Sequence, residues 1–178
     1  MSSDQAQTDQ SQILIFSLDE PRYALYLSAV ERVVRAVETT PLPKAPEFIL
    51  GVINVQGQVI PVVDIRPCFG MPRREVDQND QFILAHTSRR LVALVADSVV
   101  GIHNLAEREL VSARQVLPGA TYIRGLVKVA GDLVLLCDLD QFLSFDDEKA
   151  LQVALKGSAV KAASKSRRKT PQKTQEVA

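Results

Sequence analysis

The sequence contains no tryptophan, and only two of its 178 residues are cysteine and two are histidine. Cys68 and Cys137 follow no disulfide or zinc-binding spacing, and such isolated cysteines are typical of buried thiols in a reducing compartment. His86 and His103 have no cysteine or carboxylate at a recognised metal-ligand spacing. No glycine-rich loop opens a helix, so a phosphate-binding site is not expected either. We therefore expect no catalytic residue, no metal ion and no cofactor, and the protein is predicted not to be an enzyme.

Long apolar runs are also absent. The longest, such as Leu91–Ala96 and Leu133–Cys137, are far shorter than the roughly 20 residues that a membrane-spanning helix needs. The segment from Met1 to Gln12 is polar and acidic, and it lacks the basic start and apolar stretch of a secretory signal. The sequence therefore predicts a cytoplasmic protein.

The net charge is zero, but the charged residues are unevenly distributed along the chain. Residues 157–178 contain six lysines and arginines and one glutamate, so this tail carries a charge of +5 and residues 1–156 carry −5. The tail has no aromatic residue to stack on bases and no apolar face for a membrane surface. We expect a flexible N-terminus over residues 1–11, a folded body over 12–156 and a disordered basic tail over 157–178.

The body is predicted to consist mainly of short strands. Ten segments are rich in β-branched and aliphatic residues and are separated by turn formers, which is typical of β-strands. They are Gln12–Leu18, Tyr23–Leu27, Val30–Val37, Leu50–Val55, Val59–Ile65, Gln81–His86, Leu91–Ala96, Val99–Asn104, Ile123–Val129 and Asp132–Asp138. One helix is expected over about residues 145–156, because Ser144 and Asp147 resemble a capping box and Gly157 is a plausible stop.

An internal repeat determines how these strands are organised. The segment FILGVINVQGQVIPVVDIRPCF at 48–69 aligns without a gap on YIRGLVKVAGDLVLLCDLDQFL at 122–143, and the starts of the two halves also align. The chain therefore contains two copies of one module, at about residues 12–70 and 81–143. About five strands in each copy predict an all-β fold of two small five-stranded β-barrels related by internal pseudo-symmetry, because closure removes exposed strand edges.

Four glycines occupy matching positions in the two copies. Gly57 and Gly131 lie between the last two strands of each copy, where a tight hairpin requires a positive φ. Gly51 and Gly125 lie at the start of the first of these strands, which predicts a bulge or the close approach of another backbone segment.

The repeat also matches Asp64 with Asp138. Two equivalent carboxylates suggest a paired acid–base site, but equivalent positions in separate barrels would keep them apart. We expect each aspartate to cap the turn after the last strand of its copy.

The segment APEFILGVINVQGQVIPVVD at 45–64 resembles the signature of the CheW family of bacterial chemosensory adaptors. The similarity extends from about Gln12 to about Leu155 and includes VALVADSVVGIHNL and YIRGLVKVAGDLVLLCDL. The resemblance implies two five-stranded barrels, in agreement with the repeat. It also implies a non-enzymatic adaptor that binds the regulatory domain of a CheA-type histidine kinase and the cytoplasmic tip of a methyl-accepting chemoreceptor.

The resemblance further implies two binding surfaces. An apolar groove between the barrels would bind the helical receptor tip. This groove would be lined by Val30, Arg32, Val33, Gln56, Val99 and Ile102. Kinase contacts would come from Thr40, Leu42, Ile60, Val116 and Leu117. The alternative for these side chains is packing in the core.

The sequence departs from the family pattern at two positions of the groove. The usual arginine of an NLRG motif is Gln56 here, and the acidic residue that usually accompanies it is Arg32. These two side chains can form a hydrogen bond but not a salt bridge. We expect the fold to be unaffected and the choice of receptor to change, as in a specialised array for chemotaxis or twitching motility.

An alternative function is nucleic-acid binding, in which the basic tail would contact phosphates and the small barrels would present a binding face. Deleting residues 157–178 separates the two hypotheses. Salt-sensitive binding to nucleic acid would disappear with the tail, whereas binding of a kinase and a receptor would remain.

Overall fold

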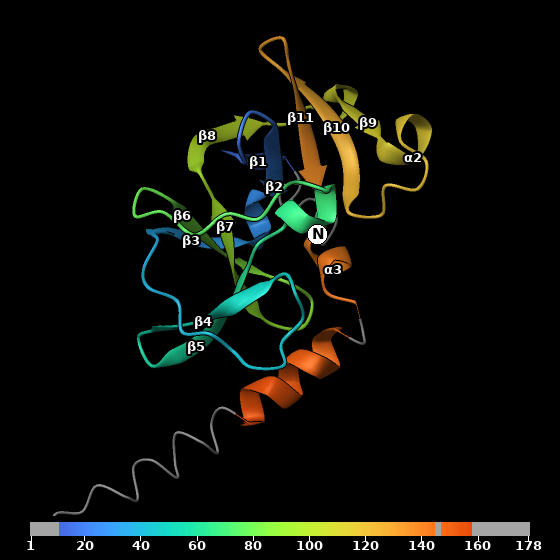
Figure 1. The fold of residues 1–178 in the computed structure, drawn as a ribbon. Helices are drawn as coiled ribbons and strands as arrows, with labels where there is room; N and C mark the ends of the chain where they lie inside the picture. Colours follow the sequence, from blue (N-terminus) through green and yellow to red (C-terminus); the bar gives the residue numbers. More distant parts are fainter. Residues whose placement is uncertain (1–10, 145–146, 158–178) are drawn as a thin grey trace, which may run out of the picture.

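The computed structural model describes residues 11–144 and 147–157, and its main regular elements are short β-strands (Figure 1). In chain order, the strands are β1 (Gln12–Ser17), β2 (Arg22–Tyr26), β3 (Val30–Arg35), β4 (Ile49–Val55), β5 (Gln58–Val63), β6 (Gln81–His86), β7 (Leu91–Ala96), β8 (Ser98–Asn104), β9 (Leu110–Ser112), β10 (Ile123–Val129) and β11 (Asp132–Cys137). Short helical segments connect them: η1 (Leu27–Ala29), η2 (Arg66–Phe69), η3 (Glu107–Glu109), α2 (Ala113–Val116) and α3 (Leu139–Phe142). All ten predicted strands are present, and β9 is an additional one.

The strands form two sheets. The first has six strands in the order β8-β1-β2-β11-β10-β9, and the second has five in the order β3-β6-β7-β5-β4. Neighbouring strands are antiparallel except for the parallel pairs β2–β11 and β5–β7. The predicted all-β class with a short C-terminal helix is confirmed.

Each sheet combines strands from both copies of the repeat. The β1–β2 hairpin of the first copy pairs with β8 and β11 of the second, and the β6–β7 hairpin of the second copy pairs with β3 and β5 of the first. The expectation that each copy closes on its own strands is therefore wrong. Residues 12–70 and 81–143 describe the repeat in the sequence, not the two sheets. The exchange places an all-apolar strand such as β7 in the middle of a sheet, where every one of its side chains is buried.

Three apolar clusters fill the interior. The central cluster contains side chains from both sheets: Leu14, Phe16, Leu18, Tyr23, Leu25, Leu42, Ile49, Val63, Ile65, Ile83, Ala85, Val92, Leu94, Ala96, Cys137, Leu139, Phe142, Leu143, Leu151 and Ala154. The second cluster belongs to the five-stranded sheet alone: Ile53, Ile60, Val62, Phe82, Leu84, Leu91, Ala93 and Val95. The third belongs to the six-stranded sheet: Ile13, Ile15, Ala24, Val127, Val134 and Leu136. The central cluster therefore joins the two sheets, and the other two fill the opposite face of each.

Short edge segments replace the predicted barrel closure. Within residues 11–144 and 147–157, no ladder joins β3 to β4 or β8 to β9. Instead, β9 covers the outer edge of β10, and a single bridge between Thr40 and Val52 covers the outer edge of β4. The bridge adds two backbone hydrogen bonds between Thr40 and Val52, and β9 pairs with three residues of β10, so these segments cover part of the edges that closure would have removed.

The predicted role of the repeat glycines Gly51 and Gly125 is confirmed. The strand register shifts beside each of them, which marks a bulge. A Cβ atom at Gly51 would overlap the carbonyl oxygen of Thr40, and one at Gly125 would overlap the side chain of Leu110. Both glycines therefore allow an edge segment to approach the sheet closely.

Both hairpin turns have left-handed backbone at their two central residues. The φ angles are 52° at Gln56 and 84° at Gly57, and 50° at Ala130 and 89° at Gly131. Two successive positive φ angles define the type I′ turn that matches the twist of the flanking strands. The prediction of positive φ at Gly57 and Gly131 is confirmed.

Gly57→Val is expected to lower the free energy of unfolding by about 1 to 3 kcal/mol, because a β-branched residue is strained at positive φ. A Cβ atom at this position would meet no atom within 4 Å, so the loss is conformational and not steric. Gly57→Asn is the matched control, because asparagine tolerates the left-handed region. Urea unfolding of the three proteins measures the effect, and an unchanged midpoint for the valine variant would contradict it.

The two repeat aspartates cap the turns that follow their strands, as predicted. The Oδ1 atom of Asp64 accepts a hydrogen bond of 3.0 Å from the backbone N–H of Arg66. In the other copy, Oδ1 of Asp138 accepts one of 3.2 Å from the backbone N–H of Asp140. They serve in separate turns and do not form a paired-carboxylate site.

A buried ion network connects the ends of β5 and β7 with the linker between the copies. Arg66 is only 1% exposed, and its guanidinium contacts Asp64 at 3.2 Å and also Asp97. Asp97 additionally binds Arg74, which contacts Asp80 at 2.7 Å. Burial alone would raise the pKa of Asp97, but a hydrogen bond from the backbone N–H of Asp19 and the two guanidinium groups outweigh it. The pKa of Asp97 therefore lies below its ordinary value.

A helix over residues 147–157 packs against the central cluster through Leu151 and Ala154. Ser144 and Asp147 form the predicted capping box: the N–H of Asp147 donates to Ser144 Oγ at 3.2 Å, and the N–H of Ser144 donates to the Asp147 carboxylate at 3.2 Å. Gly157 was predicted to stop the helix, but it is still helical. The flexible N-terminus expected over residues 1–11 and the basic tail expected over 157–178 lie outside the described residues, except for Ser11 and Gly157.

Candidate partner-binding surfaces

The residues predicted to form the receptor groove lie on edge strands of the two sheets and on one hairpin turn. Val30, Arg32 and Val33 are on β3, at the edge of the five-stranded sheet, and Val99 and Ile102 are on β8, at the edge of the six-stranded sheet. Gln56 is in the β4–β5 turn. The residues predicted for the groove therefore come from both sheets.

On β8, a bulge places the two predicted residues on one face. Val99 is paired with Phe16 and Ile102 with Leu14, and both partners belong to the central cluster. Val100 is the extra residue, so positions three apart in the sequence share a face, although strict alternation would separate them. Val99 is partly buried, whereas Ile102 is 57% exposed.

The same bulge occurs at the equivalent position of β3. Val30 is paired with Ala85 and Val33 with Ile83, which both belong to the central cluster, and Glu31 is the unpaired residue. Val30 and Val33 both pack partly against that cluster. The four aliphatic residues of the predicted groove are thus equivalent pairs of the repeat, and each is paired with a residue of the central cluster.

Arg32 does not belong to this apolar surface. It is paired with Leu84 of the second cluster, so its side chain lies on the opposite face of β3 from the valines. Its nearest charged partner is Glu31, at 4.0 Å. Gln56 follows Val55, which packs against the same second cluster. Within the described part of the chain, no hydrogen bond or ion pair joins Arg32 to Gln56.

The five predicted kinase contacts divide into accessible and buried residues. Thr40 is exposed, and Val116 and Leu117 are 50% and 40% exposed at the end of α2. Leu42 and Ile60 are 8% and 1% exposed, so core packing, the alternative considered for them, describes their position. A buried side chain is not available for direct contact.

Sequence reasoning missed two exposed aliphatic residues at the hairpin tips. Val59 is 53% exposed and Leu133, its equivalent in the second copy, is 62% exposed. Each comes two positions after the turn glycine. Both residues were expected inside strands. Their exposure follows from their position near the turn, because β7 pairs with β5 only from Val62 onward and β2 pairs with β11 only from Val134 onward.

The titratable groups singled out in the sequence have structural partners. His86 contacts Glu31 at 2.8 Å and His103 contacts Glu109 at 3.4 Å. Cys137 is buried and Cys68 partly buried, and burial raises the pKa of both thiols.

Among the described residues, no cluster of three histidine, cysteine, aspartate or glutamate side chains could hold a metal ion. In the same part of the chain, no helix has the length and apolar character needed to span a membrane.

The chain is similar to known chemotaxis proteins over the whole β-sheet body. The model of the CheW-like domain family matches residues 12–147. The chemotaxis protein CheW of Thermotoga maritima is 30% identical over 132 residues, which cover 74% of this chain and 87% of that protein. The protein FrzA of Myxococcus xanthus is 27% identical over 131 residues, covering 72% of this chain and 80% of that protein. The crystal structure of the scaffolding protein TtCheW from Thermoanaerobacter tengcongensis has a TM-score of 0.71 and 27% identity, covering 78% of this chain and 95% of that one.

Proposed function

The chain belongs to the CheW-like family, and from this premise we propose that it is a non-enzymatic adaptor that couples chemoreceptors to a CheA-type histidine kinase. The observation that carries the proposal is the family match over residues 12–147, which includes both sheets. Such partners meet on the cytoplasmic side of the membrane, so the proposal places the protein in the cytoplasm. The related proteins described above include a chemotaxis protein and a scaffolding protein, and they give no support to the nucleic-acid alternative.

The apolar surface between the sheets supports the receptor part of the proposal. A receptor tip is a helical hairpin, and an amphipathic helix binds a groove through aliphatic residues on one of its faces. Val30, Val33, Val99 and Ile102 are aliphatic, are each paired with a residue of the central cluster and come from two different sheets. For the kinase, the accessible residues Thr40, Val116 and Leu117 remain proposed contacts, while Leu42 and Ile60 do not.

The direct test is assembly of the complex from purified components. We expect the full chain to form a ternary complex with a kinase regulatory domain and a soluble receptor fragment, detected by gel filtration with light scattering. Binding of neither partner, under conditions where a CheW protein from a related array binds both, would contradict the proposal.

Val30→Asp and Val99→Asp are each expected to weaken receptor binding by about 10- to 100-fold, because the new carboxylate must lose its water when the helix docks. The matched control is Val153→Asp, which places the same charge on a valine that is 67% exposed on the C-terminal helix. Isothermal titration against one receptor fragment measures the change, and circular dichroism checks the fold. Loss of folding in both groove variants would assign these valines to the core instead.

The family pattern is tested at Gln56, which we propose as a receptor contact on the face of the five-stranded sheet that carries Arg32 and the second cluster, opposite the valines. Gln56→Arg is expected to weaken receptor binding, because its guanidinium would add to the positive charge of Arg32 on that face. The double variant Gln56→Arg with Arg32→Glu restores the usual charge pair and is expected to bind more tightly than the single variant. A double-mutant cycle by isothermal titration should give a coupling energy of at least about 0.5 kcal/mol. Gln58→Arg, on the same hairpin, is the control, and strictly additive effects would mean that positions 32 and 56 are not neighbours.

A further inference from the structure

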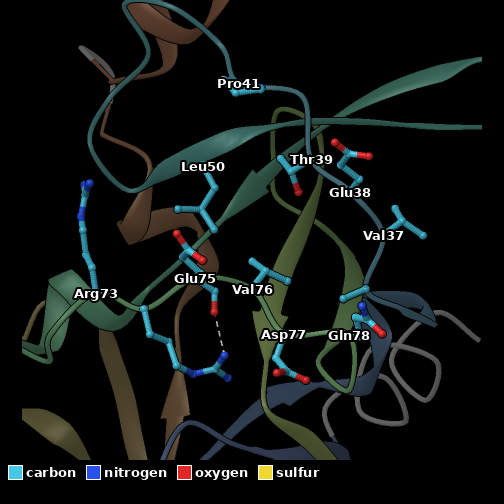
Figure 2. A pocket seen from close by; sticks show the side chains of 12 residues that line it. Val37, Glu38, Thr39, Pro41, Leu50, Arg73, Glu75, Val76, Asp77 and Gln78 are labelled. Carbon is cyan, nitrogen blue, oxygen red and sulfur yellow. Dashed lines mark hydrogen bonds between the residues drawn. The ribbon is translucent and has the colours of Figure 1, made fainter.

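A groove with a volume of about 850 Å³ lies outside the apolar surface between the sheets. One side is the segment that follows β3, residues 36–41, and the other is the linker between the two copies, residues 73–78. Figure 2 shows Leu50 of β4 and Val76 of the linker facing the space between these segments. The groove thus presents the apolar side chains of Leu50 and Val76 to a ligand.

The charges around this groove are predominantly negative. Glu38, Glu75 and Asp77 are exposed along it, and none of the three has a cationic partner among the described residues (Figure 2). The two arginines of the groove are already paired elsewhere: Arg73 with Glu47 at 3.1 Å, and Arg74 with Asp80 at 2.7 Å. Three carboxylates therefore remain to attract a cationic ligand.

We propose that the groove binds the basic segment from Lys161 to Lys173 of the chain's own C-terminal sequence. This segment contains six lysines and arginines and no acidic residue, and the rest of the chain has an excess of negative charge. Guanidinium and ammonium groups would pair with the three free carboxylates. The aliphatic stems of the same side chains would pack on Leu50 and Val76.

The end of the described chain lies within reach of the groove. Leu151 and Ala154 of the C-terminal helix belong to the same central cluster as Leu42 and Ile49, which are the chain neighbours of the groove residues Pro41 and Leu50. At about 3.3 Å per residue, the chain from Gly157 can extend roughly 40 Å by the time it reaches Lys169. Covalent attachment raises the local concentration of the segment, so weak exposed ion pairs are sufficient for binding.

Limited digestion of the full chain with trypsin tests the proposal. A lysine or arginine bound in the groove is protected, so the initial rate of cleavage after Arg167, Arg168 and Lys169 reports the unbound fraction. The triple variant Glu38→Gln, Glu75→Gln, Asp77→Asn is expected to be cleaved about 3- to 10-fold faster at low ionic strength, from two or three ion pairs of the strength typical of exposed sites. The difference should disappear at about 0.5 M NaCl, where such pairs are screened.

A variant of equal charge distinguishes the groove from general attraction to an acidic surface. Glu20→Gln, Glu107→Gln, Asp132→Asn removes three exposed carboxylates elsewhere on the protein and should leave the cleavage rate unchanged. Equal acceleration in both triple variants, or in neither, would overturn the proposal. Protection that increases with protein concentration would also overturn it, because the segment would then bind a second copy. The proposal concerns the chain alone, so it stands or falls independently of the kinase and the receptor.

Discussion

Arg66→Met is expected to lower the free energy of unfolding by about 3 to 5 kcal/mol, the usual cost of removing one partner from a buried ion pair. The substitution leaves the carboxylate of Asp64, 1% exposed, without its guanidinium. It also removes one of the two cations at Asp97. Methionine fills a similar volume, so the loss of stability comes mainly from the uncompensated carboxylates and not from a cavity.

Urea unfolding at neutral pH measures this loss, and Arg74→Met is the matched control. Arg74 binds the same Asp97 but is 34% exposed, so water replaces its contacts and a smaller loss is expected.

The loss should also depend on pH. The folded pKa of Asp97 is lowered, so the contribution of Asp97 to stability is present above the unfolded value of about 3.9 and is lost as the pH falls through the folded pKa. The difference between wild type and Arg66→Met should therefore shrink below about pH 4. Equal losses for the two methionine variants would contradict the assignment of Arg66 as the centre of the network.

Gly51→Ala is expected to cost about 2 to 5 kcal/mol, the sum of an overpacking effect and of backbone strain at positive φ. The added Cβ atom would overlap the carbonyl oxygen of Thr40, so the edge segment would have to leave β4. Two backbone hydrogen bonds between Thr40 and Val52, of 2.9 and 2.8 Å, would be lost with it.

Gly101→Ala separates these two causes. Gly101 has a φ of 154° against 153° at Gly51, but a Cβ atom there meets nothing within 4 Å. The Gly101 variant should therefore show the backbone cost alone, about 1 to 3 kcal/mol. Chemical denaturation of both variants gives the difference. If the two alanines were equally destabilising, the close approach of the edge segment would not matter to stability.

The strands of this fold are predictable from the sequence because their signals are local. Apolar runs such as those of β6 and β7 end at turn formers, and the paired glycines Gly57 and Gly131 specify the hairpins. The exchange of hairpins between the copies is not predictable in this way. β1–β2 and β6–β7 are equivalent in sequence, so nothing in either hairpin specifies which copy it will pair with. The short strand β9 was missed because three residues are too few to show a pattern.

For the candidate surfaces, the sequence predicted which residue types are present better than it predicted the face of the strand on which each side chain lies. Val30 and Val33 share a face only because a bulge interrupts the alternation of β3, and a bulge at Glu31 has no signal of its own in the sequence. Arg32 lies on the other face for the same reason. Ile60 and Leu42 belong to the core because neighbouring strands cover them, and that depends on sheet order rather than on local sequence.

The exchange of hairpins between the two copies also governs how the protein is made. During synthesis, β1 and β2 leave the ribosome long before their partners β8 and β11 exist, because these strands lie near the other end of the folded body. The nascent first half can form hairpins, but it cannot complete either sheet. Its apolar strand β1 therefore remains a target for chaperones, or for mispairing with a neighbouring nascent chain, until nearly the whole body has been translated.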